Sequence, residues 1–82
     1  MSESPLTMYG AAWCSDCRRS KKLLDASGVA YEYVDLEARP EAAHIARGIS
    51  GRTSIPVIVF PDGSHVVEPT DDELRGRLTA LV

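Results

Sequence analysis

The sequence contains only two cysteines among its 82 residues, and long apolar runs are missing altogether. Two cysteines are too few for a small secreted domain held together by several disulfides. No stretch approaches the roughly 20 apolar residues that a membrane-spanning helix needs. Residues 1–5 form a polar N-terminal tail with neither a basic start nor an apolar segment, unlike a secretory signal. We therefore expect a cytoplasmic protein that has no membrane partner.

Positive charge is also limited, since 9 lysines and arginines face 12 acidic residues and the formal net charge is -3. This balance disfavours a nucleic-acid partner, because phosphate binding needs a basic surface. His44 and His65 lie far apart in the chain and lack the ligand spacing of a zinc site, so we predict no metal and expect both to be surface residues without a role. A length of 82 residues predicts a single domain over residues 1–82.

Hydrophobic patterning predicts an α/β domain with the element order β-α-β-α-β-β-α. Strands are expected at residues 6–9, 29–36, 56–60 and 65–67, and helices at residues 15–27, at 40–48 and after Thr70. Thr70 and Glu73 have the spacing of a capping box, and Leu74, Leu78 and Leu81 form one apolar stripe. A helical connection makes the first two strands parallel, whereas the turn at Asp62-Gly63 makes the last two antiparallel. The result is a four-stranded mixed sheet flanked by three helices.

Both cysteines fall at the predicted start of the first helix, in the spacing C-x-x-C. Cys14 would lie at the helix N-terminus, where free N–H groups and the helix dipole stabilise a thiolate. Cys17, one turn further, lacks that advantage and should be more buried. These positions predict that Cys14 attacks a disulfide and that Cys17 resolves the product. Arg18, four residues after Cys14, favours the thiolate, and the charge of Asp16 opposes it.

Three motifs in this order are similar to those of the glutaredoxin family, which has the thioredoxin fold. They are Cys14-Ser15-Asp16-Cys17 after the first strand, Thr53-Ser54-Ile55-Pro56 before the third, and Asp62-Gly63-Ser64 in the hairpin. The chain most resembles the mycoredoxin branch, small actinobacterial proteins that work with mycothiol. The resemblance implies that Pro56 is cis and faces the nucleophile, and that the Ile55 backbone contacts the substrate disulfide.

Two departures from the family pattern concern the small thiol. Relatives that use glutathione usually carry C-P-Y-C, and two glycines with an acidic residue after the hairpin, where this chain has Glu68 and Pro69. Those glycines let a helix N-terminus approach the γ-glutamyl carboxylate of glutathione. We therefore expect a mycothiol-like ligand instead, whose sugar hydroxyls suit the side chains of Arg52, Thr53, Thr70 and Asp71.

Two of the expected contacts have equally ordinary explanations. Trp13 either shields one side of the thiol and contacts the substrate, or is a partly buried core aromatic. Arg52 either contacts the ligand or is a solvated loop residue.

The resemblance implies a thiol–disulfide oxidoreductase that reduces protein disulfides or mixed disulfides between proteins and a low-molecular-weight thiol. It would bind no cofactor, use mycothiol or another small thiol as cosubstrate, depend on a flavin-dependent disulfide reductase for recycling, and act as a monomer. One alternative is a hydrogen donor to ribonucleotide reductase that thioredoxin reductase recycles. Another is a dimeric carrier of an iron–sulfur cluster bound through Cys14 and a small thiol.

Overall fold

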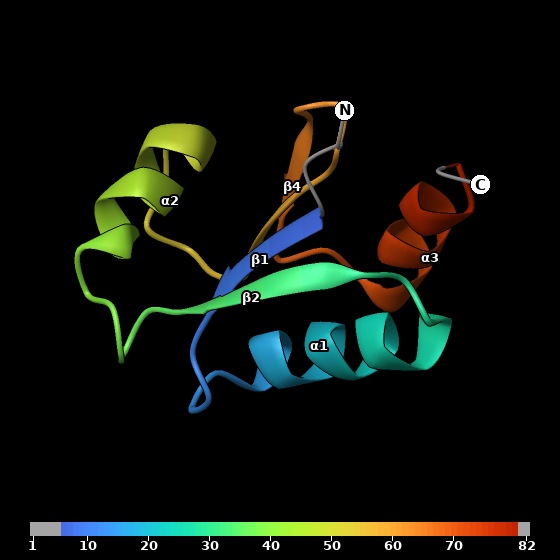
Figure 1. Ribbon diagram of the computed structural model, residues 1–82, viewed down its shortest axis with the longest axis horizontal. Helices are drawn as coiled ribbons and strands as arrows, with labels where there is room; N and C mark the ends of the chain where they lie inside the picture. The colour runs from blue at the N-terminus through green and yellow to red at the C-terminus, as the bar shows by residue number, and fades with distance from the viewer. Residues whose placement is uncertain (1–5, 81–82) are drawn as a thin grey trace.

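The computed structural model describes residues 6–80, which form one mixed sheet and three helices (Figure 1). Along the chain these are β1 (Leu6–Gly10), α1 (Ser15–Ser27), β2 (Tyr31–Asp35), α2 (Ala42–Ser50), β3 (Val57–Val59), β4 (His65–Val67) and α3 (Asp71–Thr79). The strands lie in the order β2-β1-β3-β4, with β1 parallel to β2 and both other pairs antiparallel. The predicted element order and strand directions are confirmed.

The main core lies on the face of the sheet that α1 and α3 cover. Leu6 and Met8 of β1 and Ile58 of β3 point to this face, where they pack with Leu24 of α1 and Leu74 of α3; all five are at most 1% exposed. Side chains two residues apart on a strand share a face, so β1 and β3 contribute their alternate residues here. Burial of these side chains holds α1 against the sheet.

The predicted apolar stripe of α3 is only partly visible. Leu74 is fully buried and Leu78 is partly buried against the same core, whereas Leu81 lies outside the described residues. The capping box at the start of this helix is confirmed, because the Thr70 hydroxyl accepts the Glu73 N–H at 3.1 Å and Glu73 Oε1 accepts the Thr70 N–H at 2.8 Å.

The opposite face of the sheet is covered by α2. Ala42 and Ala46 of this helix are buried. Val34 of β2 and Val57 of β3 are buried on the same face of the sheet, because both pair with the same residue of β1. Small alanines allow the helix to approach the strands closely. The two helical layers therefore enclose the sheet from both sides (Figure 1).

The predicted end of the second helix at Gly48 is wrong. The helix continues to Ser50, and Gly51 ends it with a φ of 73° while its N–H bonds to the Arg47 carbonyl at 2.7 Å. Gly48 costs some helix propensity, but Ile49 behind it is partly buried, and this contact favours one further turn. The left-handed residue is therefore the second of the two glycines.

Two predicted strands are longer than the observed ones. β2 covers Tyr31–Asp35 instead of residues 29–36, because its ladder with β1 runs from Leu6 opposite Tyr31 to Gly10 opposite Asp35. β3 likewise covers Val57–Val59 within the predicted 56–60. Strand length is set here by the partner strand, which sequence patterning does not reveal.

The last residue of β1 approaches α1 closely. A Cβ atom on Gly10 would lie 3.0 Å from Cys17 Sγ and 3.2 Å from Cys17 Cβ, both tighter than ordinary packing contacts. The absence of a side chain at Gly10 therefore allows Cys17 to be buried against β1.

We predict that Gly10→Ala lowers the free energy of unfolding by about 1–3 kcal/mol, because the added methyl group overpacks the contact with Cys17. Urea unfolding of the reduced protein measures the effect. Gly48→Ala is the matched control: nothing lies within 4 Å of its added Cβ, and replacing a helical glycine should stabilise the protein by about 0.5–1 kcal/mol. Equal effects of the two substitutions would contradict the close contact.

Candidate active site

Cys14 occupies the N-cap of α1. Its backbone is extended (φ -85°, ψ 119°), and its Sγ accepts the N–H of Cys17 at 3.4 Å. Its carbonyl already accepts the Arg18 N–H at 3.0 Å, so the helix begins directly behind the sulfur. Free N–H groups and the positive end of the helix dipole thus surround this atom. The Cys14 sulfur therefore lies at the helix end that carries free N–H donors, as the sequence predicted from its position.

The segment before β3 lies against the same sulfur. The Cys14 thiol faces the Ile55 carbonyl oxygen at 3.9 Å, and the Ile55–Pro56 peptide bond is cis, as the resemblance implied. Pro56 is buried and Ile55 is half-buried. Two parts of the chain about 40 residues apart, the start of α1 and the start of β3, therefore meet at one thiol.

Cys17 lies one turn inside α1 and is 1% exposed. Its pKa is raised from 9.0 to about 12, first because burial penalises the thiolate, and then because of its hydrogen bond with Cys14 and the negative charges of Cys14 and Asp16. Cys17 is therefore an uncharged thiol at neutral pH. The sequence correctly predicted that Cys17 is the more buried of the two cysteines.

The two charged residues nearest the cysteines in sequence are both engaged by neighbouring groups. Arg18 reaches back to the loop before the helix, where its Nη1 donates to the Ala12 carbonyl at 2.7 Å and so anchors the segment that leads into Cys14. Asp16, which we expected to oppose the thiolate, forms an ion pair with Arg19 at 3.0 Å.

Sequence reasoning missed Arg19, which connects α1 to the start of α3. Besides Asp16, its guanidinium forms an ion pair with Asp71 at 3.3 Å and donates to the Pro69 carbonyl at 3.2 Å. The i, i+3 spacing of Asp16 and Arg19 was a visible signal, but the contacts with residues 69 and 71 depend on the tertiary fold. The carboxylate of Asp71 therefore faces Arg19.

The segment before α3 lies beside the cis proline. The Glu68 N–H donates to the Pro56 carbonyl at 3.0 Å, and Glu68 has a φ of 49°, the left-handed conformation that favours glycine. Pro69 is buried behind it. The chain thus keeps a glycine-like backbone at this position while it adds a carboxylate. Thr70 follows, and its hydroxyl is occupied by the capping bond to Glu73.

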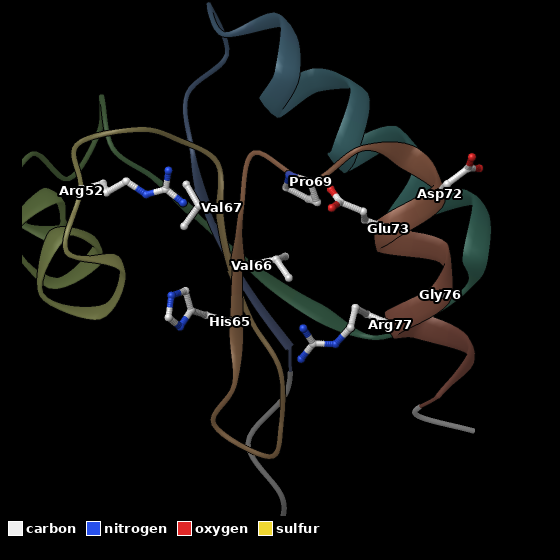
Figure 2. A pocket seen from close by; sticks show the side chains of 9 residues that line it. All are labelled: Arg52, His65, Val66, Val67, Pro69, Asp72, Glu73, Gly76 and Arg77. Atoms are coloured by element: carbon white, nitrogen blue, oxygen red, sulfur yellow. The ribbon is translucent and has the colours of Figure 1, made fainter.

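Trp13 and Arg52 were predicted to contact the substrate, and both are exposed. Trp13 is 66% exposed directly before Cys14, which excludes a core aromatic. Arg52 lines a pocket of about 540 Å³ between β4 and α3, together with Val67, Pro69 and Arg77. Figure 2 shows the Arg52 side chain pointing toward Val67 from the loop after α2, while Glu73 lies beside Pro69. Cys14 does not line this pocket, so the structure does not bring Arg52 onto the sulfur.

Neither histidine belongs to a metal site. His44 and His65 are exposed, as predicted. Within residues 6–80, no cluster of three or more His, Cys, Asp or Glu side chains is placed to hold a metal ion. Over the same residues, no helix is long and apolar enough to cross a membrane.

Comparisons with known proteins agree with this geometry. The glutaredoxin family model matches residues 6–66, which include both cysteines and Pro56. A protein of Mycobacterium tuberculosis whose name assigns it to the glutaredoxins is 34% identical over 82 residues, covering 99% of this chain and 98% of its own. Mycoredoxin 1 of Corynebacterium glutamicum is 30% identical over 79 residues, 95% of this chain and 98% of its own.

A solved structure supports the same assignment. The glutaredoxin of Archaeoglobus fulgidus superimposes with a TM-score of 0.80 at 29% identity, over 92% of this chain and 86% of its own. The fold is therefore thioredoxin-like, as predicted. The chain belongs to the glutaredoxin family, and it is a thiol–disulfide oxidoreductase. Proteins of this family use a low-molecular-weight thiol as cosubstrate.

The two thiols should differ strongly in reactivity. We predict that iodoacetamide at pH 7–9 adds a single group to the reduced protein, at Cys14, because Cys17 is buried and its pKa is about 12. Peptide mass spectrometry locates the adduct, and labelling after unfolding in urea should modify both residues. Comparable labelling of the two cysteines in the folded protein would contradict the assignment.

Proposed function

We propose that the protein reduces mixed disulfides between proteins and mycothiol as well as protein disulfides, with Cys14 as the nucleophile in both reactions and Cys17 as the resolving thiol for protein disulfides. The observation that carries this proposal is the position of Cys14 Sγ, which accepts a helix N–H at 3.4 Å and faces the Ile55 carbonyl at 3.9 Å. The first contact stabilises the anion. The contact with Ile55 places the backbone of that residue beside the sulfur, where an extended disulfide ligand can pair with this backbone.

The reaction begins when the Cys14 thiolate attacks the mycothiol sulfur of the mixed disulfide. A bond forms between Cys14 and that sulfur, the original S–S bond breaks, and its electron pair leaves with the protein thiolate. A second mycothiol thiolate then attacks the mycothiol sulfur of the adduct, which yields oxidised mycothiol and restores the Cys14 thiolate. A flavin-dependent disulfide reductase recycles the oxidised mycothiol.

Cys17 provides a second route for protein disulfides. After losing its proton, it attacks Cys14 Sγ, expels the bound thiolate and leaves a Cys14–Cys17 disulfide that small thiols reduce. The negative charge and the hydrogen bond of Cys14 contribute to the raised pKa of Cys17. The contribution of the Cys14 charge ends once that sulfur is in a mixed disulfide, which lowers the pKa of Cys17, while the larger effect of burial remains.

The start of α3 supports mycothiol over glutathione. Its first turn carries Asp71, Asp72 and Glu73, and the Glu73 carboxylate already bonds the Thr70 N–H. Glu68, whose backbone N–H bonds the Pro56 carbonyl, adds another acidic residue to this segment. A helix end occupied by its own acids is unfavourable for the γ-glutamyl carboxylate of glutathione, whereas it accepts the hydroxyls of an uncharged sugar thiol. The similarity to mycoredoxin 1 supports the same choice.

The remaining contacts and the assembly belong to this proposal. Trp13 and the backbone of Ile55 border the ligand beside the sulfur, with Thr70 and Asp71 at the far side and Arg52 nearer the edge of β4. The protein acts as a monomer of one domain in the cytoplasm, and its partners are mycothiol, protein disulfides and the recycling reductase.

Substitution of each cysteine tests the division of labour. We expect Cys14→Ser to abolish activity, because no other thiol lies at the helix N-terminus. Cys17→Ser should keep most of the activity toward small mycothiol mixed disulfides but lose the reduction of protein disulfides. Coupled turnover assays with both substrate types measure these activities. Cys17→Ala is a second variant, because an alanine side chain is better suited than serine to this buried position. Equal losses of activity in Cys14→Ser and Cys17→Ser on both substrate types would refute the assigned roles.

The segment before α3 tests the choice of thiol. We expect the double substitution Glu68→Gly and Pro69→Gly to raise kcat/KM for glutathione relative to mycothiol by about three- to fivefold, because it removes a carboxylate and bulk beside the site. Glu68→Gln is the matched control that removes the charge alone and should show a smaller change in the same direction. If neither variant changes the ratio of kcat/KM for glutathione to that for mycothiol, residues 68 and 69 do not select the thiol.

A further inference from the structure

An acidic residue between the two cysteines is unfavourable for a thiolate, yet here it lies in the first turn of α1. Cys14 is the N-cap, so Asp16 is the second helical residue, where a carboxylate is attracted to the free N–H groups of the helix. The Cys14 sulfur uses one of these groups, the N–H of Cys17. A free Asp16 carboxylate would therefore compete with the sulfur for the same positive potential and would also repel it.

In the structure, the Asp16 carboxylate is bound by an arginine side chain instead. Arg19 binds Asp16 at 3.0 Å, and its other nitrogens contact Asp71 at 3.3 Å and the Pro69 carbonyl at 3.2 Å. The contacts with Asp71 and the Pro69 carbonyl orient the guanidinium, because they fix it to the segment that follows β4. A planar guanidinium with several donors can satisfy all three acceptors at once, which the single ammonium of lysine cannot do equally well.

We propose that Arg19 is a positioning residue that acts through Asp16: it holds the Asp16 carboxylate toward the Pro69–Asp71 segment and so preserves the Cys14 thiolate. The inference rests on the proposed function only in taking Cys14 as the attacking thiol. Asp16 does act on this dithiol electrostatically, since its charge contributes to the raised pKa of Cys17. With side-chain exposures of 45% for Arg19 and 38% for Asp16, solvent screening limits the effect to a few-fold.

The test is the pH profile of Cys14 alkylation by iodoacetamide, followed by mass spectrometry. Arg19→Met should move the midpoint of the profile to higher pH and slow labelling about two- to threefold at the pH where wild-type Cys14 is half-reactive. In an Asp16→Asn background the same substitution should have little effect, because the carboxylate that Arg19 holds is gone. Arg19→Lys, which keeps the charge but not the three simultaneous contacts, should give a profile between those of the wild type and Arg19→Met.

The matched control is Arg75→Met, which removes another exposed i, i+3 ion pair, with Asp72 at 3.1 Å. It should leave the profile unchanged. The other charged or titratable residues of the segments around Cys14, namely Arg18, Glu68 and Cys17, are the same in every variant. Circular dichroism verifies that each variant is folded.

Two outcomes would overturn the proposal. Equal slowing by Arg19→Met with and without Asp16 would mean that Arg19 acts by its own charge or by general stability. An unchanged profile in Arg19→Met would mean that it does not act on Cys14 at all. The labelling uses no disulfide substrate, so neither outcome depends on whether mycothiol is the cosubstrate, and failure of that assignment is detected separately in the turnover assays.

Discussion

The burial of Cys17 against the end of β1 fixes the first turn of α1, and the site is arranged around that turn. Gly10 allows the close approach, which leaves Cys17 with 1% exposure. The N–H of Cys17 then points at the Cys14 sulfur, 3.4 Å away. One packing contact therefore acts on both cysteines: it disfavours charge on the Cys17 sulfur and supplies a hydrogen-bond donor to the Cys14 sulfur.

The sheet adds the second half of the site. Because β1 pairs with β3, the segment that precedes β3 begins beside the residue that precedes α1. The Pro56 carbonyl accepts the Glu68 N–H, so the segment before α3 lies beside the segment before β3. Three connecting segments that are distant in sequence thus lie next to one another: the start of α1 contacts the segment before β3, which contacts the segment before α3. This convergence lets a small domain build a shaped surface around Cys14 without a large core.

The sequence predicted the features that depend on local patterns, namely the order of elements, the hairpin at Asp62-Gly63, the capping box and the unequal burial of the cysteines. It placed the end of the second helix at Gly48, because the contact of Ile49 that extends the helix is tertiary. It also missed Arg19, whose bond to the Pro69 carbonyl spans 50 residues of sequence. Local patterns do not determine how an exposed side chain is shared among several partners.

The exposure of Trp13 has a practical consequence for spectroscopy. It is the single tryptophan of the chain, it is 66% exposed, and it adjoins Cys14, the proposed nucleophile. Thiolates and disulfides both quench indole emission at short range, to different extents. The intrinsic fluorescence of the protein is therefore expected to change with the oxidation state of Cys14, so that stopped-flow measurements can follow single turnovers without any attached dye.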